Sequence, residues 1–329
     1  MASQKDYFFK AVGTAGLKRS SGEAYWPHVD RYIRFIERKY KTDRPSAVGL
    51  DPIKEFLMHI YETEHSSAKT RNQALSALRF LYEGILGIHW DEEAMRSLRA
   101  KTSSNARRTL ISKQDVGKLF QALPNPHRLL FSLCYAGAMR LSDAIQLRVK
   151  DVSFDQEAIT ICDCKHDHFR SVPLPRSLHA AVQRQIDSVR VIHGHDAHDN
   201  PNGVPLPDAR ARKAPSDARS MSWYWLFSSD KLSRDPDTGF FGRWHIDANH
   251  ARKVFKASLA KAGIDRRITP HDLRRTAATR MHFEMGMPLA RLQVILGHNS
   301  LDQTREYILE DEIQINGTMS PFDALGLTG

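Results

Sequence analysis

The stretch TPHDLRRT, residues 269–276, decides how this chain is interpreted. Thr269 is suited to cap a helix, Pro270 to fill its first position, and the acid three residues after the threonine to complete a capping box. His271 and Arg274 then lie three residues apart on one face of the first turn. A helix N-terminus that presents histidine and arginine together predicts a site for a phosphate group.

Two further stretches carry residue types with the same affinity for phosphate. In ILGHNSLDQTREY, residues 295–307, His298 follows a glycine at a predicted turn, and Tyr307 lies nine residues later. In LCYAGAMRLSD, residues 133–143, Arg140 precedes a helix that Ser142 is suited to cap. A glycine-containing turn there would aim the arginine at a ligand. Taken singly, each motif also fits an ordinary surface arginine or a packed tyrosine.

The segment CDCKHDHFR, residues 162–170, lies between the strand-like runs EAITICD and RSVPLP, which predict a β-hairpin. Its cysteines and histidines fall at every second position, so same-face neighbours along a strand are about 7 Å apart. A zinc site needs four ligands around one ion, and this spacing does not supply them. We therefore expect no metal here.

Composition and charge favour a nucleic-acid partner. The chain has 329 residues, a net charge of +10 and a pI of about 9.5, which favours a polyanion. Its length predicts about two domains. Three cysteines make no disulfide framework, no stretch is long and apolar enough for a membrane span, and the start lacks a signal-peptide apolar region. We expect a cytoplasmic, nucleoid-associated bacterial protein with no membrane partner.

Together the motifs resemble the signature of the tyrosine recombinase (phage integrase) family. That signature has an arginine just before Ser-Glu or Ser-Asp, a hairpin lysine, H-x-x-R, L-G-H, and a tyrosine nine residues on. The same order and spacing are present here. By resemblance the catalytic residues are Arg140, Lys165, His271, Arg274, His298 and the nucleophile Tyr307, with Asp143 in support.

The resemblance implies a reaction that uses no metal and no ATP. Two arginines clamp the charge that builds on a phosphodiester under attack, and histidines donate further hydrogen bonds. The tyrosine attacks the phosphate and becomes joined to the 3′ end of the cut strand. The bond energy is kept in this phosphotyrosyl link. Lysine on the hairpin supplies a proton to the leaving oxygen, and His168 is a candidate contact to a backbone phosphate.

The implied fold is mainly α with a small β-hairpin or sheet (α+β), in two domains that form a C-shaped clamp on DNA. Helical periodicity over 22–40, 50–62 and 70–87 predicts a compact four-helix domain. The resemblance implies that this is a SAM-like core-binding domain at 1–98. A basic linker at 99–111 follows. Its candidate contacts to the DNA backbone are Arg99, Lys101, Arg107 and Arg108. The catalytic domain, 112–329, begins near Ser112, a predicted N-cap.

A closer resemblance is to the integron integrases, on the stretches TRNQALSALRFLYEGILG, NGVPLPDARARKAP, WYWLFSSDKLSRDPDTGFFGRWH and SPFDAL. It implies integration and excision of gene cassettes at attachment sites that include folded single-stranded hairpins. Unpaired bases would stack in an insert at about 193–245. The candidates for this contact are Trp223, Pro236, Trp244 and His245. Trp225 and Phe227 alternate with Trp223 and also fit a buried strand, and HGHDAHD fits a solvated loop.

Two alternatives remain from the sequence: a phage- or chromosome-type recombinase on duplex sites, and a catalytically inactive DNA-binding relative. The family further implies a homotetramer on DNA in which a C-terminal segment, about 312–329, is exchanged between protomers. Three positions depart from the family pattern. Trp244 and Arg275 stand where histidine is common, and Glu306 beside Tyr307 is expected to raise the pKa of the phenol.

Overall fold

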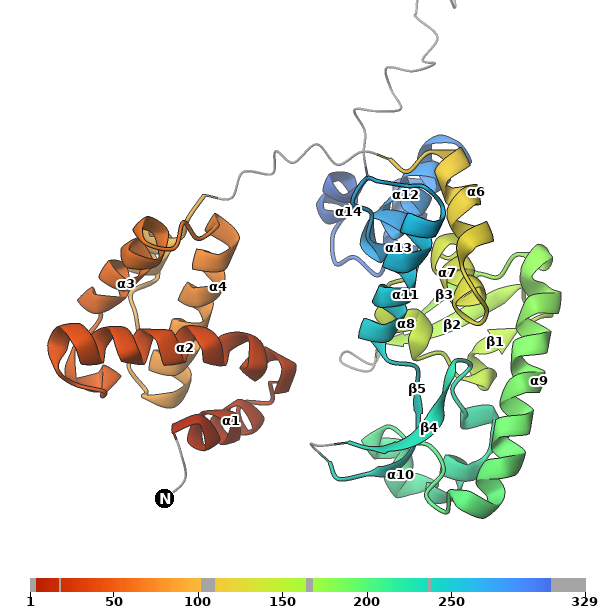
Figure 1. Cartoon of the computed structure of the whole chain (residues 1–329), viewed down its shortest axis with the longest axis horizontal. Helices are drawn as coiled ribbons and strands as arrows, with labels where there is room; N and C mark the ends of the chain where they lie inside the picture. The colour runs from red at the N-terminus through yellow and green to blue at the C-terminus, as the bar shows by residue number, and fades with distance from the viewer. Residues whose placement is uncertain (1–3, 18, 102–109, 164–167, 236–237, 309–329) are drawn as a thin grey trace, which may run out of the picture. The chain divides into compact units, whose positions relative to one another are not determined.

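The structure is a computed structural model that describes residues 4–17, 19–101, 110–163, 168–235 and 238–308. It divides into two compact units, Met1–Arg107 and Arg108–Gly329, and each is described here by itself. Figure 1 shows the course of the chain through both units. No helix in the described ranges is both long and apolar enough to cross a lipid bilayer.

The N-terminal unit is helical. Its described helices are α1 (Gln4–Thr14), α2 (Arg19–Tyr40), α3 (Asp51–Glu62), α4 (Ala68–Arg79) and α5 (Glu92–Leu98), with a π-helical segment at Phe80–Ile85. The prediction of four helices was wrong, because five α-helices are present among the described residues of this unit. Apolar side chains at helical spacing, such as Tyr32 and Ile36, are fully buried in a single core.

The C-terminal unit is also mainly helical and carries two small sheets, which confirms the predicted α+β class. Its described helices are α6 (Lys113–Ala122), α7 (His127–Ala136), α8 (Leu141–Ile145), α9 (Arg176–Asp199), α10 (Asp208–Lys213), α11 (Ala248–Lys261), α12 (Pro270–Phe283), α13 (Leu289–Leu296) and α14 (Leu301–Tyr307). The predicted N-cap of α6 is confirmed, since the Ser112 hydroxyl accepts a hydrogen bond from the Asp115 N–H at 3.0 Å.

The predicted hairpin is present. Strands β1 (Val152–Ser153), β2 (Ala158–Asp163) and β3 (His168–Pro173) form an antiparallel sheet in that order, and the last paired residues of β2 and β3 are Asp163 and His168. The tip that carries Lys165 lies outside the described residues. A second, two-stranded sheet consists of β4 (Ser228–Arg234) and β5 (Phe241–His245).

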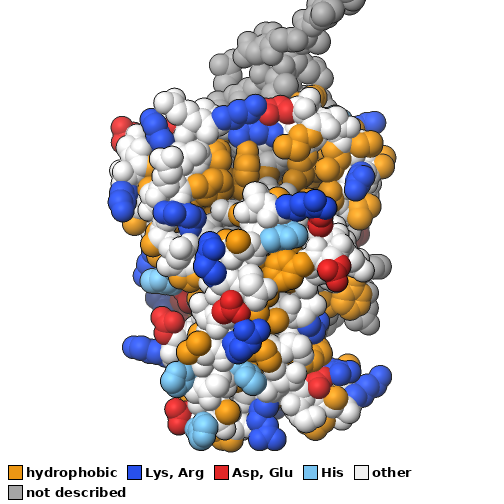
Figure 2. Space-filling view, turned by 90° about the vertical axis from the view of Figure 1, so that its right-hand side faces the viewer, with side chains coloured by type: hydrophobic (Ala, Val, Ile, Leu, Met, Phe, Trp, Pro, Cys, Tyr) orange, Lys and Arg blue, Asp and Glu red, His pale blue; other side chains and the backbone are white. Residues whose placement is uncertain are grey.

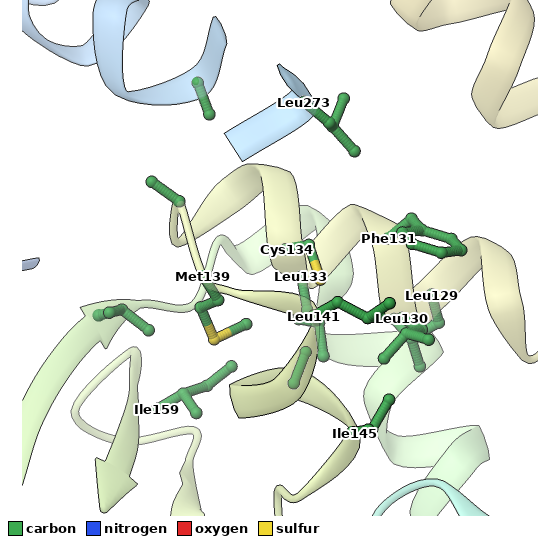
Figure 3. Packing of buried hydrophobic residues seen from close by; sticks show 14 of the residues in the cluster. Leu129, Leu130, Phe131, Leu133, Cys134, Met139, Leu141, Ile145, Ile159 and Leu273 are labelled. Carbon is green, nitrogen blue, oxygen red and sulfur yellow. The ribbon is translucent and has the colours of Figure 1, made fainter. Parts of the chain in front are cut away.

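The core of the C-terminal unit forms where α7 meets the first sheet and α12. Figure 3 shows Leu130 and Leu133 of α7, Met139 of the following turn, Ile159 of β2 and Leu273 of α12 converging on the same apolar interior. All five side chains are 1% exposed or less. Close packing of this kind fixes the position of α12.

Helix α12 is the most enclosed element of the unit. Nine consecutive residues, Leu273–Met281, are buried, and α7, α13 and the segment that precedes α6 pack against the helix. One hydrogen bond from the Ile111 N–H to the Thr276 hydroxyl, at 3.2 Å, fixes that segment to the helix. A site built on α12 therefore rests on a rigid support.

The tract at 193–245 is not the loop-rich region that the sequence predicted. Helix α9 continues to Asp199, so the sequence HGHDAHD forms its last turns instead of a solvated loop. Asp196 in those turns is 1% exposed. In Figure 1, α9 runs along one side of the unit to the end where α10, β4 and β5 lie, away from α12–α14.

Figure 2 views a face on which basic and acidic side chains are interspersed, with an apolar hollow near its upper end.

Candidate active site

The first turn of α12 presents the H-x-x-R pair as predicted. The Thr269 N–H donates to the Asp272 carboxylate at 2.9 Å, and the Asp272 N–H donates to the Thr269 hydroxyl at 3.3 Å, which completes the capping box. His271 is exposed, whereas Arg274 is 1% exposed. One residue therefore lies at the mouth of the site and the other lies inside it.

The Arg274 guanidinium is buried with spare hydrogen-bond donors. Its Nη2 donates to the Leu296 carbonyl at 2.7 Å, but Nε and Nη1 have no hydrogen-bond acceptor among the described residues. Burial lowers the pKa of Arg274, and the neighbouring Tyr307 opposes this change. A buried cation with two unused N–H groups is poorly satisfied until an anion binds.

Arg140 reaches the site from the turn between α7 and α8. It is the N-cap residue of α8 and is partly exposed, and its Nη1 lies 3.9 Å from the Asp143 carboxylate. The prediction that Ser142 caps this helix was wrong, because the Arg140 N–H is satisfied by Asp143 instead. The turn also differs from expectation, since Ala138 adopts the positive φ of 44°.

Arg170 is a site residue that the sequence analysis missed. From β3 its guanidinium donates to the Asp143 carboxylate, and its Nε donates to the Ile295 carbonyl of α13 at 3.1 Å. It therefore joins the hairpin to the helix of Arg140 and to the segment before His298. A signal was present in the sequence: alternation along β3 places Arg170 on the same buried face as Val172, while Phe169 is 68% exposed.

His298 occupies the predicted turn between α13 and α14. Gly297, at φ 62°, ends α13 in the left-handed conformation, and the Ser300 hydroxyl caps α14. The Nδ1 atom of His298 lies 3.1 Å from the Thr304 hydroxyl. Burial, with nearby Arg274 as the next cause, lowers the pKa of His298 to about 4. The imidazole is thus neutral at physiological pH in the absence of a bound anion.

Tyr307 at the end of α14 lies among the other candidate residues. It is 8% exposed, and its ring centroid is 5.1 Å from that of His298 and 5.3 Å from that of His271, both edge-on. The guanidinium carbons of Arg275 and Arg274 lie 4.8 and 5.7 Å from the same centroid. The structure thus brings Tyr307 together with His298 of its own motif and with three residues of the stretch at 269–276.

The pKa of the Tyr307 phenol is raised, as predicted, but the cause is burial and not Glu306. Burial raises its pKa, and the charges of Arg274, Arg275 and Arg140 oppose that rise. Glu306, to which we had attributed the rise, is exposed and is not among the principal causes. The Tyr307 hydroxyl makes no hydrogen bond of good geometry with the described residues, although Arg274 is near enough to favour the phenolate.

A basic cleft of about 880 Å³ opens beside this cluster. Arg140, His271 and Arg274 line its inner end, and α11 contributes Arg252 and Lys256. The loop before α12 adds Arg266 and Arg267. Because cations dominate its charged lining, the cleft is suited to a polyanion.

Several predicted residues are only partly covered by the structure. Lys165, Pro236, Arg107 and Arg108 lie outside the described residues, and so does the His168 side chain. Arg99 and Lys101 are exposed after α5, as a contact to DNA would require. Where placement is described, no cluster of three or more histidine, cysteine or acidic side chains has metal-binding geometry.

The predicted base-contact residues of the insert differ in environment. Trp223 is partly exposed, and its ring lies 4.6 Å from Lys150 Nζ and 5.1 and 5.5 Å from the guanidinium carbons of Arg148 and Arg210. Trp225 and Phe227 are buried, as the alternative interpretation predicted, but they precede β4 and do not form the predicted strand. Trp223 is thus the aromatic ring of this group that reaches the surface.

The other two described candidates lie on β5. The Trp244 ring is partly exposed, and its indole N–H is buried without an acceptor among the described residues. His245 is largely enclosed: it packs edge-on against Trp225 with ring centroids 5.1 Å apart, and burial lowers its pKa. Trp244 is therefore better placed than His245 to meet a ligand.

Comparison with known proteins agrees with this arrangement. The phage integrase family model matches residues 109–312, and the phage integrase N-terminal SAM-like domain model matches residues 6–92. Two proteins named integrase/recombinase, from Escherichia coli and Pseudomonas aeruginosa, are each 32% identical over 305 residues, which is 92% of this chain and 88% of theirs. The chain therefore belongs to the phage integrase family.

Its activity class follows from that membership: the protein is a tyrosine recombinase, a site-specific enzyme that breaks and rejoins DNA strands. Among solved structures it is similar in fold to a lambda integrase(75-356) dimer bound to a COC′ core site. The TM-score is 0.60 at 16% identity, and the match covers 93% of this chain and 94% of that chain.

Proposed function

We propose that Arg140, His271, Arg274 and His298 bind the scissile phosphate of a DNA strand and that Tyr307 attacks it. The observation that carries this proposal is the buried Arg274 guanidinium, whose Nε and Nη1 lack an acceptor beside Tyr307. A phosphate at this point would accept a charge-assisted hydrogen bond from this guanidinium. Arg140 at the cleft wall would contact the other non-bridging oxygen.

The attack forms a bond between the Tyr307 oxygen and phosphorus and breaks the bond to the 5′ oxygen of the next nucleotide. The phenol must lose its proton as this happens, and the cationic groups around it favour the negative charge. We assign the proton for the leaving 5′ oxygen to Lys165, on the sequence motif alone. Because the phosphotyrosyl bond keeps the energy of the original bond, rejoining is the reverse step and uses neither ATP nor a metal.

We further propose that the substrate is an integron cassette site, recognised in part as a folded single strand. Trp223 supports this, since it is a partly exposed aromatic ring beside the cations Lys150 and Arg210, where an unpaired base can stack. The unused indole N–H of Trp244 is a second candidate contact. Pro236 and His245 are weaker candidates for this contact. Pro236 is supported by the sequence alone, and the ring of His245 is largely enclosed.

The proposal also covers the oligomeric state of the protein on DNA and its place in the cell. Related structures include a lambda integrase tetramer bound to a Holliday junction. We propose that this chain likewise acts as a homotetramer on DNA in the bacterial nucleoid, with the two units clamped around the site and residues 312–329 exchanged between protomers.

The mechanism is tested by covalent trapping. A suicide oligonucleotide, nicked close to the cleavage phosphate of a candidate cassette site, is incubated with the protein in the presence of a chelator. We expect a denaturation-resistant protein–DNA adduct with the wild type and none with Tyr307→Phe. Tyr7→Phe, an exposed tyrosine of α1, is the matched control. An adduct with Tyr307→Phe, or none with any site tested, would refute the mechanism and favour an inactive DNA-binding relative.

The substrate form is tested by gel-shift titration of the folded bottom strand of a cassette site against the same sequence as duplex. Stronger binding to the folded strand, reduced by Trp223→Ala, supports the integron assignment. Equal or stronger binding to duplex would favour the phage- or chromosome-type recombinase.

A further inference from the structure

Arg275 lies close to the ring of the candidate nucleophile, Tyr307. It follows Arg274 on α12 and is 6% exposed, and its guanidinium carbon lies 4.8 Å from the centroid of the Tyr307 ring. The corresponding distance for Arg274 is 5.7 Å. The two arginines therefore approach the same ring, and the one not assigned to the phosphate approaches it more closely.

A cation near an aromatic ring face acts on that ring in two ways. It is attracted to the electron-rich face, and the attraction is stronger where water is excluded. It also stabilises negative charge on the ring, and a phenol gains such charge as it ionises. Guanidinium stays protonated throughout, so it changes the energy of the phenolate without exchanging a proton with it.

We propose that Arg275 is a positioning residue for Tyr307: it holds the ring by its face and stabilises the negative charge that the oxygen carries during attack on DNA. This rests on the proposed role of Tyr307 as the nucleophile. Among the described residues, His271 and Arg274 of α12 and His298 ahead of α14 also lie against the ring, and Arg140 at the start of α8 acts on the phenol through its charge. Those four residues are the proposed phosphate ligands, so Arg275 is the cation near the ring that has no assigned contact with the phosphate.

The same helix carries another buried arginine, whose partners belong to α7, to the segment before α6 and to the end of α12. Arg280 is 7% exposed, donates to the Tyr135 hydroxyl at 2.6 Å and to the Ile111 carbonyl at 2.7 Å, and lies 3.4 Å from the Glu284 carboxylate. These partners account for its burial. Arg280→Met is therefore a control for loss of a structural arginine from α12.

The test measures the ionisation of residue 307 without DNA. A fluorinated tyrosine is placed at position 307, where its more acidic phenol titrates within the stable pH range, and its ¹⁹F resonance is followed against pH. We expect Arg275→Met to raise the pKa of this group by about one unit, a roughly tenfold weaker ionisation. Arg275→Lys should produce less than half of that change. Arg280→Met and the exposed Arg305→Met should produce almost none.

Strand cleavage provides the second readout. With a saturating suicide substrate, Arg275→Met should slow adduct formation about tenfold at pH 7 and recover rate as the pH rises, with DNA affinity unchanged. An unchanged titration in a folded Arg275→Met protein would overturn the proposal, as would equal effects of Met and Lys. If Arg275→Met does not fold, Arg275→Gln takes its place. A wild type that forms no adduct would refute the nucleophile while leaving the titration intact, so the two failures are distinguishable.

Discussion

Arg170 of β3 donates to the Asp143 carboxylate of α8, and this pair fixes the hairpin against the helix that starts at Arg140. The two side chains are 9% and 16% exposed. Removal of one partner from a buried ion pair leaves the other charge uncompensated, so Arg170→Met should destabilise the catalytic unit by about 3 kcal/mol. Cleavage should fall more than tenfold, because three parts of the site lose their common anchor.

Urea denaturation and adduct yield check this prediction. The control is Arg176→Met, which removes an ion pair to Glu157 whose side chains are 82% and 41% exposed. Exposed pairs contribute roughly 0–1 kcal/mol, so this variant should resemble the wild type. Equal behaviour of the two variants would show that Arg170 does not organise the site.

Gly297→Ala tests the turn that presents His298. The glycine has φ 62°, and an added Cβ would lie 3.2 Å from Arg170 Nη1. The left-handed conformation costs a residue with a Cβ about 1–2 kcal/mol. Gly286→Ala is the matched control, because it has φ 67° and no atom within 4 Å of the new Cβ. Both variants should lose similar stability in thermal unfolding, but cleavage should fall strongly only in Gly297→Ala.

His298 makes the stability of the catalytic unit depend on pH. Its pKa in the folded protein is about 4, below the ordinary 6.5, so the unfolded chain binds a proton that the folded chain does not. The stabilising effect of the neutral ring is complete above pH 6.5 and is lost as the pH falls toward 4. The loss is up to roughly 3 kcal/mol.

The measurement is the free energy of unfolding at a series of pH values for the wild type and His298→Gln. The slope between pH 6.5 and 4 should become flatter in the variant. His195→Gln, which removes an exposed ring from α9, controls for the loss of a histidine as such. An unchanged slope in His298→Gln would contradict the prediction.

The insert depends on one buried charge. Asp196 accepts hydrogen bonds from Arg243 Nε at 2.9 Å and from the Tyr224 hydroxyl at 3.1 Å. Burial by itself would raise the pKa of Asp196, but the hydrogen bonds from Arg243 and Asn200 outweigh it and the pKa is lowered. Asp196→Asn should therefore destabilise the insert by about 3 kcal/mol.

Limited proteolysis and hydrogen exchange over residues 193–245 check this. Asp187→Asn is the control on the same helix, since its ion pair with Arg190 is half-exposed. The insert should open more readily only in the Asp196 variant. Binding to folded single-stranded DNA should fall with it, because Trp223 and Trp244 would lose their support.

The local motifs of the site were predictable from sequence, because each depends on residues close along the chain. The capping box at Thr269 and Asp272, the turn at His298 and the hairpin register all follow from backbone chemistry that acts over a few residues. The gathering of these motifs around Tyr307 was inferred from a resemblance, since periodicity does not bring distant segments together.

The errors arose where distant residues decide the structure. The sequence HGHDAHD continues α9 because Asp196 has a buried partner, Arg243, that lies 47 positions away in the chain. Ser142 does not cap α8 because the helix begins at Leu141 with Arg140 as its N-cap residue. Arg170 was overlooked because its partners lie on α8 and α13. Tertiary contacts override local preference in such places.

The enclosure of α12 has a consequence for the protein without DNA. Two adjacent arginines of this helix, Arg274 and Arg275, are buried, and the like charge of Arg140 adds to burial in lowering the pKa of Arg274. The positive charge of Arg274 is therefore disfavoured in the protein without DNA, and a polyanion that reaches Arg274 stabilises it. By mass action the bound form is then the more stable one. Binding of its DNA substrate is therefore expected to stabilise the folded recombinase as well.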